Sequence, residues 1–361
     1  MDREIETEIH VETILFLAHT EADGTLAKAA LEALGTAQDL AASLPGTALV
    51  AGLFGAQVTA AANEIAQCGA QQVFAVEGDD FSSPRYATDA AAVEMLCRSS
   101  RATVVIAPAT SRLSRVMAGV SYRLNGRIDT HVNGITATNG APAITRWFYR
   151  QRMVAELQRT QRPWLLLVDS GCHAPYQGAS GAATIEVLQV ALGDVHKQTQ
   201  VTGIEAPKAD EQTIRPDADL LFVAGAGWTK KQKDGQSHPQ DAEDLILGFL
   251  RQTKASLGSS KSLVDLSGEG QSVLKFMSHM NQVGQTGATP RHPKGLSTCC
   301  HGEEPHVVGW RFINERRAIN LDANCGWARG KADVVYVADA FEVMKKLNAL
   351  VAEKKASSVG A

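Results

Sequence analysis

The sequence predicts an α/β protein made of two domains, and three observations support this. In the first half, short apolar segments alternate with helical ones and are too continuous to have one polar face. This is typical of parallel strands covered by helices on both sides. The length of 361 residues suits about two domains. The stretch 196–217 is polar, contains Pro207 and Pro216 and has no periodicity, so we expect an interdomain linker there.

The first domain is expected to span residues 1–195. Its first strand is the buried run at 11–17, and Ala and Leu recur at helical spacing over 25–43. The next expected elements are strands at 47–54, 72–76 and 103–107 and helices around 61–65 and 91–97. After residue 134 the pattern changes to short segments separated by turns. A few antiparallel strands are therefore expected at 142–149, 153–157 and 164–168.

The second domain is expected to span residues 218–361. Its expected strands are 220–224, 262–266, 317–321 and 334–337, and its expected helices are 239–254, 270–280 and 340–353. The last helix is followed by the polar tail KKASSVGA, which we expect to fray.

Composition excludes several classes of protein. Lys and Arg number 35 against 39 Asp and Glu, and this near balance argues against nucleic acid or an anionic membrane as the main partner. No apolar run approaches the roughly 18 residues of a membrane span, so the protein should not be membrane-embedded. The acidic start MDREIETE resembles neither a secretory signal nor a transit peptide. Six cysteines without a CxxC pair predict reduced thiols in the cytoplasm and no metal site.

Two glycine-containing strings follow expected strands or helices. Gly225 and Gly227 come directly after the strand 220–224, where a ligand can approach the backbone closely. The spacing GxGxxG is incomplete because Lys230 stands where the third glycine would fall, so an ordinary turn fits equally well. The string NQVGQTG at 281–287 is more distinctive, because it offers amide and hydroxyl groups on a flexible backbone. Such a loop suits a polar planar ligand.

Polar residues near later strands extend the candidate site. His301 and His306 follow a short segment that ends at residue 299, and a histidine at a strand end can place a cation against a developing anion. Asn320, Asp322 and Asp333 lie at or beside two strands, as partners of a ribose or a base do.

The order of these features resembles the flavin domain of the electron-transfer flavoprotein alpha subunit. The most specific part is VGQTG, and the run ILFLAHTEADGTLAKAALEAL resembles the family's first strand and helix. The likeness extends from about residue 11 to 350. It implies an N-terminal α/β domain that packs on a beta subunit and a C-terminal Rossmann-like domain that binds FAD at the junction of the heterodimer.

The resemblance also implies an electron carrier rather than an enzyme that converts a substrate. FAD would accept electrons from a dehydrogenase and pass them to a quinone-linked acceptor or an iron–sulfur protein, with no catalytic residues in the usual sense. Gln285 and Thr286 would lie beside the isoalloxazine and ribityl, His306 at the N1/O2 edge, and Asn320 and Asp333 at the adenosine end. The full set of implied cofactor-binding residues is Gly225, Ala226, Gly227, Ser260, Gln285, Thr286, Gly287, His301, Gly302, His306, Asn320 and Asp333.

Departures from the family pattern keep other functions open. Ala226 stands where the family has an Arg over the ring, and His301 replaces a hydroxyl. The family's INKD string ends here at Asp322 and has lost its Lys. One alternative is therefore a scaffold subunit with a degenerate flavin site. A flavin-dependent oxidoreductase with its own substrate is less favoured, because no motif contains an acid–base pair. The sequence identifies neither the electron donor nor whether the partner carries AMP or a second FAD.

Overall fold

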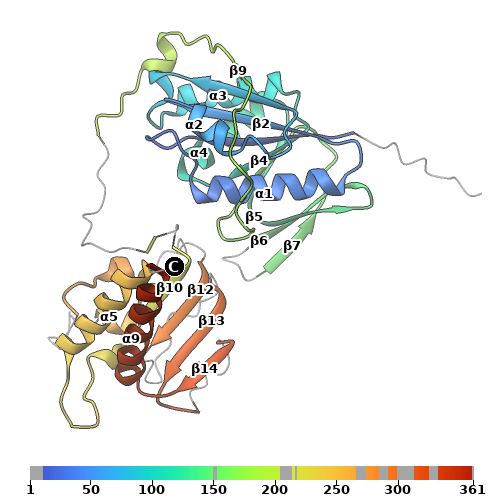
Figure 1. Cartoon of the computed structure of the whole chain (residues 1–361). Coiled ribbons are helices and arrows are strands. Elements are labelled where there is room, and N and C mark those ends of the chain that lie inside the picture. Colours follow the sequence, from blue (N-terminus) through green and yellow to red (C-terminus); the bar gives the residue numbers. More distant parts are fainter. Residues whose placement is uncertain are drawn as a thin grey trace, which may run out of the picture. The chain divides into compact units, whose positions relative to one another are not determined.

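The computed structural model describes residues 11–148, 153–203, 214–215, 218–265, 274–283, 292–298, 313–324 and 332–359. The chain divides into two compact units, Met1–Ile204 and Glu205–Ala361. Each unit has its own sheet with helices packed against it (Figure 1). None of the helices in the described ranges combines the length and the apolar character of a membrane span.

The N-terminal unit contains a nine-stranded sheet in the order β7-β6-β5-β8-β4-β1-β2-β3-β9. Its strands are β1 (Thr13–His19), β2 (Ala48–Gly55), β3 (Gln72–Glu77), β4 (Val104–Pro108), β5 (Arg127–Thr138), β6 (Ala141–Phe148), β7 (Met153–Leu157), β8 (Trp164–Val168) and β9 (Ile185–Val187). Strands from β9 to β5 along this order pair in parallel, whereas β5, β6 and β7 form an antiparallel edge. The α/β class with a parallel sheet is therefore confirmed.

One strand differs from its expected direction. The segment 164–168 was expected among the antiparallel strands, but β8 lies between β4 and β5 and pairs in parallel with both. All five of its residues are buried, since both faces of this inner strand are covered. A strand buried on both faces needs a continuous apolar run, and WLLLV is such a run.

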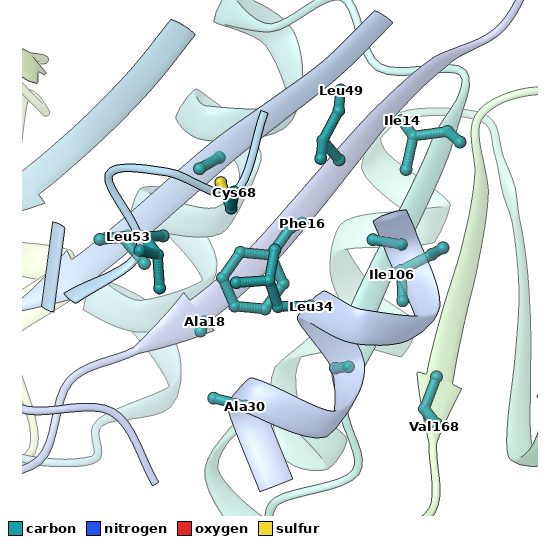
Figure 2. Close-up of a cluster of buried hydrophobic side chains, with 14 of the residues drawn as sticks. Ile14, Phe16, Ala18, Ala30, Leu34, Leu49, Leu53, Cys68, Ile106 and Val168 are labelled. Atoms are coloured by element: carbon teal, nitrogen blue, oxygen red, sulfur yellow. The ribbon is translucent and has the colours of Figure 1, made fainter. Parts of the chain in front are cut away.

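Helices cover both faces of this sheet. They are α1 (Lys28–Ser43), α2 (Thr59–Glu64), α3 (Tyr86–Ser99) and α4 (Ser111–Arg123). Alternate residues of β1 face opposite sides: Phe16 lies in one core cluster with residues of α1 and α2, and Leu15 in the other with residues of α3 and α4. Figure 2 shows members of the first cluster, among them Phe16 of β1 and Leu34 of α1. Burying such a side chain contributes about 1.5–3 kcal/mol.

The C-terminal unit contains a five-stranded parallel sheet in the order β11-β10-β12-β13-β14. Its strands are β10 (Leu220–Ala224), β11 (Ser256–Ser259), β12 (His292–Thr298), β13 (Ile313–Asn320) and β14 (Val334–Val337), and its helices include α5 (Pro239–Thr253), α6 (Lys261–Asp265) and α9 (Ala340–Val359). Helices α5 and α9 pack side by side (Figure 1). Their residues Phe249 and Met344 share one core cluster with Phe222 of β10.

Three expected elements of this unit differ from the structure. The strand expected at 262–266 is wrong: the strand is Ser256–Ser259, and Lys261–Asp265 is a helix. The Ser260 hydroxyl accepts a hydrogen bond from the Leu263 amide at 3.2 Å, so the chain turns into a helix where the strand was expected. The described part of 270–280 contains only the short 3₁₀ helix His279–Asn281, and α9 continues through Val359 rather than fraying after 353.

Candidate functional site

The topology of the C-terminal sheet indicates where a ligand binds. From β10 the chain passes to β11 on one side and later returns to β12 on the other side of β10. Open α/β sheets bind ligands beyond the carboxyl ends of the two strands at such a reversal, here β10 and β12. The sequence-predicted residues Gly225–Gly227 follow β10 directly, so the structure places them at this point.

Residues Ala226–Trp228 form a single 3₁₀ turn at the end of β10. The Gly225 amide donates to the Thr298 carbonyl at 2.9 Å, which ties the turn to the end of β12. The side chains of Ala226 and Trp228 are buried in the cluster that contains Phe222. A ligand would therefore meet Ala226 through its backbone, and an arginine at this position would have to place its charge within the apolar core.

The end of β11 presents two serines with different surroundings. Ser260 donates its amide to the Ala224 carbonyl at 2.8 Å, and its hydroxyl accepts from Leu263 while retaining a proton to donate. Ser259 is fully buried, and its hydroxyl has no hydrogen-bond partner among the described residues. The sequence identified Ser260 as a candidate but not Ser259. The only signal for Ser259 was its position next to Ser260.

Asn320 ends β13 on the same carboxyl edge. Its side chain is 1 % exposed, and its Oδ1 accepts the Asp322 amide at 3.0 Å. Its Nδ2 has no hydrogen-bond partner within the described ranges. An unsatisfied buried amide costs about 1–3 kcal/mol, so a ligand acceptor at this position would recover that free energy.

Asp333 and Asn320, which were expected at one ligand end, lie at opposite ends of two paired strands. Asp333 precedes β14, whereas Asn320 is in register with Val337 at the other end of that strand. The Asp333 carboxylate accepts from the Arg316 amide at 2.7 Å and from its guanidinium at 3.1 Å, and these bonds lower the pKa of Asp333.

The acidic residue that the structure places at the carboxyl edge of β14 is Asp339. Its Oδ1 accepts from the Phe341 amide at 2.9 Å, where α9 begins. An Asp immediately before the helical run AFEVMKKL is an N-cap pattern, and that signal could have identified it from the sequence.

Six of the predicted site residues lie outside the described residues: Gln285, Thr286, Gly287, His301, Gly302 and His306. The described residues on their flanks belong to the same edge of the sheet. The Val283 amide donates to the Ser259 carbonyl at the end of β11, and Thr298 ends β12. The last described residue before each string, Val283 or Thr298, therefore lies at the carboxyl edge.

The equivalent position in the N-terminal unit is bridged by protein side chains. That sheet reverses between β1 and β4, and His19 Nε2 lies 3.1 Å from the Thr110 hydroxyl across their carboxyl ends. Burial lowers the pKa of His19, which favours a neutral imidazole in this hydrogen bond. Beside it, Arg112 forms a buried ion pair with Asp89 at 2.7 Å. Because these side chains already bond to one another, the C-terminal unit provides the better ligand site.

Comparison with known proteins gives two findings. Residues 14–194 match the family model of the electron transfer flavoprotein domain. Over 326 residues, the chain is 24 % identical to the electron transfer flavoprotein subunit alpha of Syntrophomonas wolfei subsp. wolfei (strain DSM 2245B / Goettingen). This alignment covers 90 % of the present chain and 95 % of that relative, so the similarity extends through both units.

Proposed function

The chain belongs to the electron transfer flavoprotein family as a divergent, alpha-like member, and we propose that it is the FAD-binding alpha subunit of a heterodimer. In this proposal a beta subunit completes the protein. The heterodimer would carry electrons from a dehydrogenase to a quinone-linked or iron–sulfur acceptor. FAD supplies the redox chemistry, and the chain binds it, orients it and limits its contact with water.

The observation that carries this proposal is the buried Asn320 side-chain amide without a partner among the described residues, at the carboxyl edge of the sheet. The adenosine end of FAD carries ring nitrogens and ribose oxygens that can accept this hydrogen bond. The neighbouring turn supports the same ligand. The carbonyls of Gly225, Ala226 and Gly227 accept from Trp228, Thr229 and Gln232, and the Gly225 amide donates to Thr298. The amides of Ala226 and Gly227 are therefore the donors of this turn that we propose for an anionic or carbonyl group of the ligand.

The residues proposed to hold the flavin follow the ends of several strands at this edge. The Gly225–Gly227 backbone, the hydroxyls of Ser259 and Ser260 and the Asn320 amide are described by the structure. Gln285, Thr286, Gly287, His301, Gly302 and His306 are proposed from the resemblance. A protonated His306 at the N1/O2 edge would stabilise negative charge on the ring.

The first test is the visible absorbance of the chain purified together with its beta subunit. We expect flavin bands at one FAD per heterodimer. A colourless heterodimer that also fails to bind added FAD would contradict the proposal and favour a scaffold subunit with a degenerate site.

A second test addresses Asn320 directly. Asn320→Ala should weaken FAD binding about three- to tenfold, because one net hydrogen bond is lost. Asn324→Ala is the matched control, since Asn324 is exposed four residues further along the same segment. Equal FAD dissociation constants for the two variants, measured by flavin fluorescence, would show that the Asn320 amide does not face the cofactor.

A further inference from the structure

We propose that Trp228 is a positioning residue for the flavin: its indole N–H holds Thr298 and thereby fixes the two strand ends at the ligand site. This inference rests on the proposed FAD site. It concerns the sheet reversal between β10 and β12, where the protein backbone is to meet the cofactor.

Thr298 is the point at which the two strand ends are joined. Trp228 Nε1 donates to the Thr298 hydroxyl at 2.8 Å, and that hydroxyl donates to the Val223 carbonyl at 3.1 Å. The Thr298 carbonyl accepts the Gly225 amide at 2.9 Å. One residue of β12 is thus bonded to β10 and to the turn that follows it, through both its backbone and its side chain.

The indole ring is buried and packs against α9. Trp228 is fully buried, and its ring lies 4.6 Å from the ring of Phe341 at an interplanar angle of 58°. Phe341 belongs to the first turn of α9. Trp228 therefore connects the ends of β10 and β12 to the beginning of α9, and a rotation of the turn would displace the indole from this packing.

The backbone of the same turn depends on this arrangement. The Trp228 amide donates to the Gly225 carbonyl at 3.3 Å, and the Gly227 carbonyl accepts from Gln232 Nε2 at 3.0 Å. These bonds direct the carbonyls toward protein partners. If the indole hydrogen bond holds the turn, its loss changes the direction of the backbone donors as well as the stability of the unit.

The experiment compares four variants of the chain in complex with its beta subunit. Trp228→Phe keeps an aromatic ring and removes the N–H. Thr298→Val removes the hydroxyl, whereas Thr298→Ser retains a hydroxyl. Trp164→Phe is the matched control. Trp164 is also fully buried and donates its Nε1 to Asp129 at 2.9 Å, but it lies in the N-terminal unit. The readouts are the FAD dissociation constant, the visible absorption maxima and reduction potential of bound flavin, and the midpoint of thermal unfolding.

We expect Trp228→Phe and Thr298→Val each to weaken FAD binding about three- to tenfold and to shift the absorption maxima and reduction potential. Thr298→Ser should retain wild-type values. Trp164→Phe should lower the unfolding midpoint without changing the flavin readouts.

Two results would overturn the inference, and they are distinguishable from failure of the proposed function. If Trp228→Phe lowers only the unfolding midpoint, as Trp164→Phe does, Trp228 has a purely structural role. If Thr298→Val leaves the flavin unchanged, the hydrogen bond does not position it. A wild-type heterodimer that binds no FAD would instead contradict the proposed function itself.

Discussion

At the scale of single residues, the buried carboxylate of Glu32 makes a pH-dependent contribution to stability. Glu32 lies on α1, and its Oε2 accepts from the Gly171 amide at 2.7 Å and the Ser170 hydroxyl at 3.2 Å. Burial raises the pKa of Glu32 above its ordinary value of 4.5. The folded state therefore binds this proton more tightly than the unfolded state, and the cost of the buried charge is present above the raised pKa and disappears below 4.5.

Glu32→Gln should consequently raise the free energy of unfolding at neutral pH, because the neutral amide can still accept the Gly171 hydrogen bond. The difference from wild type should shrink as the pH falls and vanish below 4.5. Urea unfolding at the two pH values measures this. Glu186→Gln is the control: Glu186 is exposed, accepts from Gln72 and should change stability by less than about 0.5 kcal/mol. An equal loss of stability for Glu32→Gln at both pH values would show that the hydrogen bonds outweigh the burial.

A second residue-scale prediction concerns Asp129, which is buried among three donors. Its carboxylate accepts from Arg146 at 2.8 Å, from Arg159 at 2.9 Å and from the indole of Trp164. Burial alone would raise the pKa of Asp129, but these bonds outweigh it and lower the pKa. Asp129→Asn should lower the free energy of unfolding by about 2–4 kcal/mol, since it leaves two guanidinium groups without their partner. Asp39→Asn, which alters an exposed pair with His173, should cost less than about 1 kcal/mol in the same urea titration.

At the scale of elements, Asp339 and Asp333 distinguish the two ends of β14. Asp339 caps α9, so Asp339→Ala should lower the free energy of unfolding by about 0.5–2 kcal/mol. It should also weaken FAD binding, because the cap lies at the carboxyl edge of the sheet. Asp333→Ala breaks the pair with Arg316 at the opposite edge and should leave the FAD dissociation constant unchanged. A loss of FAD affinity with Asp333→Ala but not with Asp339→Ala would contradict our proposal, because it would show that the cofactor binds at the opposite edge of the sheet.

Elements were predictable from the sequence where burial leaves a continuous apolar signal. Strand β10 and helix α5 were expected close to their observed bounds, because LLFVA is buried on both faces and α5 has an apolar stripe. Strand β5 was missed because its residues are largely half-buried or exposed and because register shifts interrupt it near His131. Strand β11 was misplaced because SLGS has only one large apolar residue, although all four residues are buried.

The candidate site was predictable to a smaller extent, because its geometry depends on tertiary structure. The glycine turn after β10 and Asn320 were identified by their positions after strands, and the structure brings both to the carboxyl edge. Asp333 was expected together with Asn320 but lies at the other edge of the sheet, because adjacency to a strand in the sequence does not say at which end of the sheet a residue lies. No role for Trp228 could be inferred from the sequence, because its hydrogen bond joins residues 70 positions apart.

At the scale of the whole molecule, each unit has an exposed apolar sheet edge. Strand β7 ends one side of the first sheet with Val154 51 % exposed, and β14 ends the second sheet with Tyr336 47 % exposed. Unpaired strand edges with apolar side chains promote association with another chain. A partner subunit that covers such an edge would stabilise the folded chain by mass action.

We therefore predict that the chain alone self-associates and holds little FAD, whereas co-expression with its beta subunit raises both soluble yield and FAD content. Val154→Lys tests the edge itself, because a charge on an edge strand opposes further pairing. Sedimentation velocity should show less self-association of this variant than of wild type. Val187→Lys on β9, at the other end of the same sheet, is the matched control and asks whether the effect is specific to β7. A wild-type chain that remains a monomer on gel filtration and keeps one FAD without its partner would contradict the prediction. In that case the flavin site would be complete within this chain, and the exposed edges would have no part in holding the cofactor.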